Sequence, residues 1–339
     1  MSILHTLEST AQELLAEGKG LLAADESFPT IGKRFEALDI PSTEENREAY
    51  REMLFTTRGL SDFISGVILF DETLRQRTKD SVPLPELLAD QGILSGIKVD
   101  KGAIALPNFP GEKFTQGLDG LRERLGEYHQ LGARFTKWRA VIAIGDGPTS
   151  SCIEANAHSL ALFAALSQEA GLVPIVEPEV LMDGKHTIER CEEVTRATLE
   201  FVFYELDNQR VALEGMLLKT GMILSGKDAA RKADVEEVAE ATIRCLRRAV
   251  PATVPGIVFL SGGQSDVAAT ERLNAICRVT GPPWTLSFSF GRALQDAALK
   301  TWHGSAANAV SAQAALHHRA RCNSLAVQGE YSEQAERES

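Results

Sequence analysis

Short apolar runs alternate with longer amphipathic stretches along the chain. We count eight apolar runs rich in Val, Ile, Leu and Phe, and helical spacing of apolar residues characterises the stretches between them. This alternation predicts repeated strand–helix units around a parallel sheet. The predicted strands are at residues 21–26, 64–70, 94–99, 134–141, 172–179, 214–220, 256–262 and 284–291.

Eight strand–helix units favour an α/β fold of one particular kind, a closed parallel (β/α)8 TIM barrel, over an open sheet. An extra N-terminal helix near residues 5–17 precedes the first strand, and we expect it to plug or flank the barrel bottom. A capping-box signal at Ser42 and Glu45 opens a later helix, and an Ala-rich run from Ser151 to Ala170 forms another.

The length of 339 residues lies within the range of one such barrel, so we predict a single domain at residues 1–327. Residues 328–339 are polar and charged with few apolar side chains, a composition that predicts a disordered C-terminal tail.

The charge balance limits the possible partners. A formal net charge of −12 argues against binding to nucleic acid or to an anionic membrane, because both are polyanions. The five cysteines are odd in number and far apart, which is typical of reduced thiols in a cytoplasmic protein. The sequence also has no signal-peptide pattern and no apolar run of membrane-spanning length, so we expect neither secretion nor membrane insertion.

Charged residues gather where the predicted strands end, and in a TIM barrel this edge carries the active site. Residues two apart on a strand point to the same face, so three pairs should project into one mouth. A lone lysine at a strand end is usually a solvated rim residue, but joint occurrence on five strands indicates a site. The charged residues concerned are Asp25, Glu26, Lys98, Asp100, Lys137, Arg139, Glu177, Glu179 and Lys219.

A cluster of lysines has a chemical meaning, because a lysine amine attacks a carbonyl only when it is neutral and neighbouring cations favour that form. Spacing alone does not choose among the three lysines. We favour Lys219 as the nucleophile because its strand carries no other charge, with Lys137 as the neighbouring cation. Glu177 would then transfer protons, and Asp25 would hold or deprotonate a sugar hydroxyl.

Two glycine-containing segments predict phosphate binding. LSGGQS at 260–265 and SFGRAL at 289–294 each end a strand and precede a helix, so backbone N–H groups can approach an anion there, beside Arg292. An isolated Gly-Gly would only indicate a tight turn, but the two segments together favour an anion site. A second anion site could form from Ser27, Thr30, Lys33, Arg34 and Lys98.

No metal or organic cofactor is predicted. None of the seven histidines belongs to a strand-end cluster or to a helical H-x-x-x-H pair, and the chain has no Walker loop and no G-x-G-x-x-G after its first strand.

These segments resemble a known family, the class I, Schiff-base-forming fructose-bisphosphate aldolases. The resemblance covers residues 21 to about 300, in the family's order. It rests on LLAADES, GVILFDETL, GIKVDKG, TQGLDGL, KWRAV, IVEPEVL, LLKTGM, FLSGGQS and SFSFGRALQ.

The resemblance implies a metal-independent lyase that reversibly cleaves fructose 1,6-bisphosphate to dihydroxyacetone phosphate and glyceraldehyde 3-phosphate. It implies that Lys219 forms the Schiff base, that Glu177 is the acid/base residue and that Asp25 acts at the C4 hydroxyl. Lys137, Arg139, Lys98 and Glu179 match further site residues, and Arg34 matches a substrate-contacting arginine. The matches to the phosphate-binding residues are Ser261, Gly262, Gly263, Ser289, Gly291 and Arg292. The family is commonly tetrameric, so a homo-oligomer is expected.

The sequence departs from the family pattern at several points. Phe28 and Pro29 follow the ADES motif where Thr-Gly is usual, and Thr30 stands where the family has Ser. Thr220 and Gly221 follow the nucleophile where Pro-Asn is usual. Many relatives end in a terminal tyrosine that assists proton transfer, whereas Tyr331 is not terminal here and receives no such role.

Other functions stay open at this stage. The enzyme could act on a wider range of phosphorylated ketoses, including fructose 1-phosphate or the seven-carbon bisphosphate, or it could be a transaldolase-like Schiff-base enzyme. A non-enzymatic scaffold would keep the barrel and bind partners through its surface, but the complete set of Asp25, Lys137, Glu177 and Lys219 weighs against it.

Overall fold

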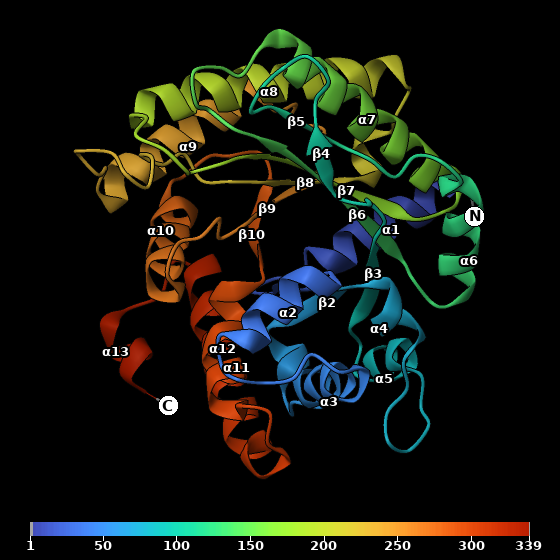
Figure 1. Cartoon of the computed structure of the whole chain (residues 1–339). Coiled ribbons are helices and arrows are strands. Elements are labelled where there is room, and N and C mark those ends of the chain that lie inside the picture. Colours follow the sequence, from blue (N-terminus) through green and yellow to red (C-terminus); the bar gives the residue numbers. More distant parts are fainter. Residues whose placement is uncertain (1–2, 339) are drawn as a thin grey trace.

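The computed structural model describes residues 3–338 and contains a closed barrel of eight parallel strands (Figure 1). Each of the eight predicted strands corresponds to one observed strand, which confirms the TIM-barrel prediction. The barrel strands are β1 (Gly20–Ala24), β2 (Ile64–Leu69), β3 (Leu94–Lys98), β6 (Phe135–Ile142), β7 (Val173–Val180), β8 (Leu217–Thr220), β9 (Gly256–Phe259) and β10 (Thr285–Phe290).

Helices surround this barrel in the order that the sequence alternation predicts, with most of the strands followed by at least one helix (Figure 1). The 3-10 turns are η1 (Leu60–Asp62), η2 (Leu213–Gly215) and η3 (Ala306–Asn308). The α-helices are α1 (Ile3–Leu14), α2 (Phe28–Glu36), α3 (Glu44–Phe55), α4 (Asp71–Arg75), α5 (Leu84–Asp90), α6 (Leu121–Gln130), α7 (Ser150–Glu169), α8 (Ile188–Asn208), α9 (Val235–Ala249), α10 (Asp266–Arg278), α11 (Arg292–Trp302), α12 (Ala309–Val327) and α13 (Glu333–Arg337).

Helix α1 closes the barrel bottom, as expected for the extra N-terminal helix. Its buried residues Leu7 and Leu14 belong to a core cluster with inward-facing strand residues such as Phe135 and Ile175. The Phe135 ring occupies this end so closely that a Cβ at Gly96 would lie 2.2 Å from it. A larger apolar core fills the space between the strands and the outer helices. Because the bottom is packed with apolar side chains, the polar strand residues are left at the opposite, carboxyl end.

A short hairpin was not predicted from the sequence. Strands β4 (Ala103–Ala105) and β5 (Lys113–Thr115) pair antiparallel after β3. The Thr115 hydroxyl donates to the Arg139 carbonyl at 2.8 Å, which fixes the hairpin to β6. The hairpin therefore borders the barrel mouth next to Arg139.

The helix start predicted at Ser42 is displaced by one residue. Helix α3 is capped by Thr43, whose hydroxyl accepts from the Asn46 backbone N–H at 3.2 Å. Ser42 and Thr43 are both good capping residues, and the sequence pattern did not distinguish them.

The C-terminal tail differs from the predicted disorder. Within the part of it that the structure describes, Glu333–Arg337 form α13, which lies outside α12 (Figure 1). Glu336 pairs with Arg319 of α12, which is 3% exposed, and accepts from the Tyr331 hydroxyl at 2.6 Å. Composition alone missed this helix because its order depends on a buried cation elsewhere in the chain.

Across residues 3–338, none of the helices is both long enough and apolar enough to span a bilayer.

Candidate active site

A cavity of about 580 Å³ opens at the carboxyl end of the barrel strands. It brings together residues from at least seven strand ends and from α2. Fifteen of the sixteen predicted site residues line it, namely Asp25, Ser27, Thr30, Arg34, Lys98, Lys137, Arg139, Glu177, Glu179, Lys219, Ser261, Gly262, Ser289, Gly291 and Arg292. Gly263 is outside the lining, although a Cβ there would lie 3.4 Å from the guanidinium of Arg292.

A chain of alternating charges crosses the floor of the cavity. The Lys219 Nζ lies 3.1 Å from Oε1 of Glu177, whose Oε2 lies 3.3 Å from the Lys137 Nζ. Lys137 in turn lies 2.6 Å from Oδ2 of Asp25. The side chains of both lysines and of Glu177 are at most 5% exposed. Four residues from β6, β7, β8 and the end of β1 thus form one desolvated network.

The two lysines differ in their surroundings. Lys137 contacts carboxylates on both sides, whereas Lys219 lies within 4 Å of one carboxylate among the described residues. Burial favours the neutral amine of Lys137, but the charges of Asp25, Glu177 and Asp100 outweigh burial and raise its pKa far above the ordinary value. Lys137 is therefore a fixed ammonium ion.

Both carboxylates of the network stay ionised. Burial alone would raise the pKa of Asp25, yet Lys137, Lys219 and Lys98 lower it well below the usual range. The same balance holds for Glu177, where Lys219, Lys137 and Arg139 outweigh burial and lower the pKa. Glu177 is consequently in the form that accepts a proton, and it can act as a base before it acts as an acid.

Two further ion pairs line the cavity beside this network. Arg139 of β6 donates through Nε to Glu179 of β7. Lys98 lies 3.0 Å from Asp100, whose second carboxylate oxygen accepts from the Arg139 backbone N–H at 3.2 Å. The paired residues two apart on β6 and β7 do share a face, as their spacing predicted.

The loops after β9 and β10 have the geometry predicted for an anion site. Gly262 and Gly263 have φ of 55° and 89°, a left-handed region that favours glycine. Gly291 precedes α11, and a Cβ there would lie 3.3 Å from the Ala23 carbonyl. The hydroxyl of Ser289 is buried and has no hydrogen-bond partner within residues 3–338. An unpaired buried hydroxyl beside Arg292 suits a phosphate oxygen.

Arg34 lines the cavity, but its guanidinium is engaged. It donates to Glu26 and, at 2.8 Å, to Asp296 of α11. Glu26 is also held by Arg51 of α3 at 2.6 Å. Sequence reasoning noted Glu26 as a strand-end charge but missed Arg51, because the partner lies on another helix and carries no local signal.

An aromatic contact holds the start of α2 where the sequence departs from the family pattern. The rings of Phe28 and Phe70 meet edge to face, with centroids 5.1 Å apart, and the guanidinium carbon of Arg47 lies 4.8 Å from the Phe28 ring centroid. Arg47 also donates to both carboxylate oxygens of Glu72, at 2.8 and 2.5 Å. These contacts fix the start of α2 in place. They therefore also fix the positions of Ser27 and Thr30, which are one residue before and two residues after Phe28.

One group of potential metal ligands lies away from this cavity among the described residues. The donor atoms of His318, Cys322 and Glu336 lie within 4.8 Å of one another at the α12–α13 contact. Glu336 already binds Arg319 and Tyr331, so this group anchors the tail. Tyr331 does not line the cavity. All five cysteines are free thiols.

Comparison with known proteins agrees with this geometry. The family model described as "Glycolytic: Fructose-bisphosphate aldolase class-I" matches residues 6–339. A "Probable fructose-bisphosphate aldolase class 1" of Xanthomonas campestris pv. campestris is 58% identical, with 98% of this chain and 99% of that protein covered. The fructose-bisphosphate aldolase of Dictyostelium discoideum is 50% identical, with 96% and 92% covered.

The solved structures include one of similar fold and sequence. It is the fructose-bisphosphate aldolase of Plasmodium falciparum, in complex with TRAP and a small-molecule inhibitor. The TM-score is 0.96 at 49% identity, with 97% of this chain and 96% of that chain covered. The chain belongs to the class I fructose-bisphosphate aldolases, lyases that cleave fructose 1,6-bisphosphate reversibly through a lysine Schiff base.

Proposed function

We propose that Lys219 is the lysine that forms the Schiff base with the ketone carbon of the sugar. The observation that carries this assignment is the order of charges Lys219, Glu177, Lys137 and Asp25 in one buried network. Lys137 is held as an ammonium ion by two carboxylates and cannot attack a carbonyl, and Lys98 is paired with Asp100. Lys219 has one carboxylate neighbour, which is also the group that can take its proton.

We propose that Glu177 moves protons between Lys219 and the substrate. Its Oε1 lies 3.1 Å from the Lys219 Nζ, within reach of direct transfer. As an ionised carboxylate it takes one proton from the Lys219 Nζ, which leaves a neutral amine that attacks the ketone carbon. In the carbinolamine one N–H proton passes to the former ketone oxygen and makes it a hydroxyl. Glu177 then gives its proton to that hydroxyl, which leaves as water, and the protonated imine remains.

The imine then makes carbon–carbon cleavage possible. Asp25, ionised and 2.6 Å from Lys137, is proposed to take the proton of the C4 hydroxyl. As the C4 oxygen becomes a carbonyl, the C3–C4 bond breaks and its electron pair moves into the protonated imine, forming an enamine. Lys137 keeps a positive charge between the two carboxylates, and Glu179 fixes Arg139 at the rim.

Two anion sites are proposed for the two phosphates of the substrate. Ser261, Gly262, Ser289, Gly291 and Arg292 would hold the phosphate nearer Lys219, with Gly263 shaping the loop. The distal phosphate would meet a second group at the mouth, formed by Ser27, Thr30, Arg34, Lys98 and Arg139. We also propose, on family likeness, that the enzyme works as a cytoplasmic homotetramer, which light scattering of the purified protein would test.

Borohydride trapping tests the nucleophile assignment. With dihydroxyacetone phosphate, a chelator and borohydride, the reduced imine should become a stable adduct on the peptide that contains Lys219, as read by mass mapping. Unmodified Lys137 and Lys98 peptides in the same digest are the internal control. An adduct on either of those peptides would overturn the assignment, and a requirement for metal would overturn the mechanism.

Replacing Glu177 with Gln should lower kcat by about 10²- to 10⁴-fold, the usual contribution of general acid–base catalysis. The amide keeps the size of the side chain but cannot accept the Lys219 proton. Glu205→Gln on α8 is a matched control, because Glu205 pairs with His158 outside the cavity, and its kcat should be unchanged. A Glu177→Gln enzyme with wild-type kcat would exclude Glu177 from the mechanism.

Replacing Phe28 with Ala should raise the KM for fructose 1,6-bisphosphate by about 3- to 10-fold, because aromatic and cation–π contacts contribute about 0.5 to 1.5 kcal/mol. Loss of the contacts with Phe70 and Arg47 loosens Ser27 and Thr30. Phe28→Tyr keeps the ring and should keep the KM. Steady-state kinetics with fructose 1-phosphate, which lacks the distal phosphate, should show no comparable change; equal effects on both sugars would argue against this role.

A further inference from the structure

A second cavity, of about 250 Å³, is lined by the segments that follow β7 and β8 and by residues of α9 and α10, and it shares no lining residue with the catalytic cavity. Three of its lining residues are cations, Lys227, Lys232 and Arg272, and none is a carboxylate. The chain as a whole has 47 acidic and 35 basic residues. The charge of this pocket is therefore opposite in sign to the net charge of the chain.

Arg272 of α10 lacks a counter-ion. Its Nε is buried without a hydrogen-bond partner, and it forms no ion pair with any residue from 3 to 338. Burial lowers the pKa of its guanidinium, and the charge of Glu271, its exposed neighbour, offsets this only partly. A guanidinium withdrawn from water without an opposite charge costs free energy, so buried cations in proteins are usually paired. Arg272 is partly buried, so an anion in the pocket would supply the opposite charge that its guanidinium lacks.

The other polar groups of the pocket are donors as well. The Lys232 Nζ donates to the carbonyls of Gly226, at 2.5 Å, and Lys227. An ammonium has three hydrogens, so one remains for a ligand. The hydroxyl of Ser225 accepts from the Ala233 backbone N–H at 3.0 Å and keeps its own hydrogen. A guanidinium, two ammonium groups and a hydroxyl match the several oxygens of a phosphate.

We propose that this pocket binds one phosphate group, from inorganic phosphate or from a small phosphate monoester, outside the catalytic site. Met182 and Leu224 give it an apolar wall against which the short carbon chain of an ester can lie. The site is tied to the catalytic loop, because Arg272 donates to Gln264 at 2.6 Å and Gln264 donates to the Ser261 carbonyl at 3.0 Å. The inference is independent of the roles proposed for Lys219 and Glu177.

Calorimetry on the full chain tests this site. The enzyme is first loaded with one equivalent of a hexitol 1,6-bisphosphate, which occupies both phosphate positions of the catalytic cavity and has no ketone to react. Inorganic phosphate and glycerol phosphate are then titrated in separate experiments. We expect one further phosphate per chain, and the tighter of the two ligands tells whether the pocket favours the free ion or an ester.

Pocket variants locate the binding. Arg272→Met should weaken phosphate binding at least about tenfold, since hydrogen bonds to charged groups contribute about 1.5 to 3 kcal/mol. The double variant Lys227→Met/Lys232→Met should act similarly, and because both lysines are exposed it should fold and keep the wild-type kcat in phosphate-free buffer.

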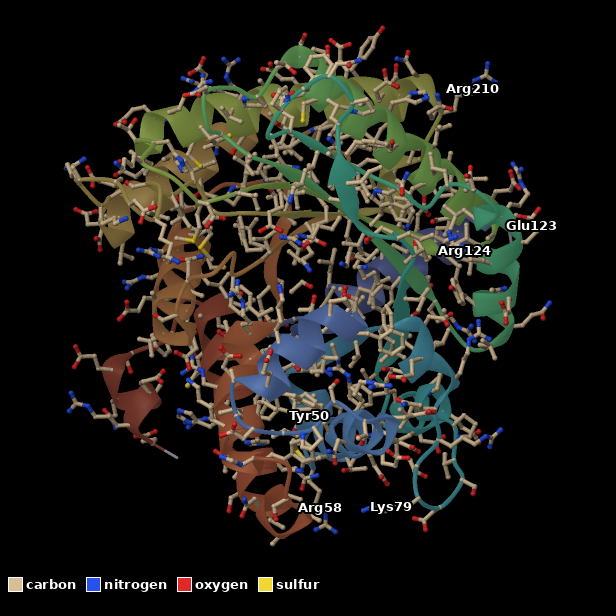
Figure 2. The ribbon with its side chains drawn as sticks, in the orientation of Figure 1. Tyr50, Arg58, Lys79, Glu123, Arg124 and Arg210 are labelled. Carbon is tan, nitrogen blue, oxygen red and sulfur yellow. The ribbon has the colours of Figure 1, made fainter. Side chains whose placement is uncertain are left out.

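Lys79→Met is the matched control. Lys79 is an exposed lysine on the loop between α4 and α5, labelled at the lower edge of Figure 2, well away from α10. Its replacement should leave phosphate binding unchanged. No phosphate uptake by the loaded wild type, or equal affinity in the wild type and in both sets of pocket variants, would overturn the proposal.

Discussion

Replacing Lys219 with Arg is expected to lower kcat for fructose 1,6-bisphosphate cleavage by at least about 10⁴-fold, the scale seen when a covalent nucleophile is removed. Arginine keeps the positive charge beside Glu177 but cannot give up its proton in a protein. The variant therefore loses the amine that attacks the ketone. Its guanidinium can still form an ion pair with Glu177, in place of the 3.1 Å pair between Lys219 and Glu177. Coupled-assay turnover measures the effect.

The same variant should also lose the borohydride-stabilised adduct, which separates loss of the imine from a general loss of activity. Lys300→Arg, on the exposed face of α11, is the matched control and should retain both turnover and adduct. Full activity in Lys219→Arg would assign the Schiff base to another lysine, and the mass map would identify which one.

The barrel and most of the site could be predicted because they depend on local periodicity. Apolar runs of strand length defined eight strands, and parallel strands in a closed barrel must present their carboxyl ends at one edge. Residues as far apart as Asp25 and Lys219 therefore meet without any local signal linking them. Spacing alone left the choice among Lys98, Lys137 and Lys219 open; the lack of other charges on its strand favoured Lys219, and the resemblance implied the same residue.

The features that were missed depend on contacts between distant segments. Arg34 was predicted as a substrate-binding residue, but no local signal indicates that its guanidinium pairs with Glu26 and with Asp296, 262 residues away. The tail was expected to be disordered because nothing in its composition reveals that Arg319 lies buried opposite Glu336. Strands of three residues, such as β4 and β5, are too short for a periodic pattern to appear.

Charged residues on the surface differ in their surroundings from those at the strand ends. The labelled cations Arg58, Lys79 and Arg210 project from the periphery of the molecule in Figure 2, as expected for charged residues outside the strand ends. Exposed charges of this kind are solvated and contribute little to stability. The charged side chains on the floor of the cavity, Asp25, Lys137, Glu177 and Lys219, are at most 13% exposed, so each of them needs a partner, and a change in one affects the others.

Replacing Lys137 with Met should destabilise the enzyme and inactivate it together. Asp25 has no cation other than Lys137 within 4 Å among residues 3–338, so its carboxylate would lose its direct ion pair and keep only the more distant charges of Lys219 and Lys98. Removing one partner of a buried pair typically costs about 3 to 5 kcal/mol in the free energy of unfolding. Asp25 and Glu177 would also lose a cation that lowers their pKa values, so both would be protonated more readily and act less well as bases.

A second substitution separates these two effects. In the double variant Asp25→Asn/Lys137→Met no unpaired charge remains at Asp25, so urea unfolding should recover much of the lost stability. Activity should stay low, because the proposed base at the C4 hydroxyl is gone. Lys137→Arg, which retains the cation, should unfold close to the wild type. If Lys137→Met were as stable and as active as the wild type, the buried charge network would have neither its structural nor its catalytic role, since both depend on a permanent cation between Asp25 and Glu177.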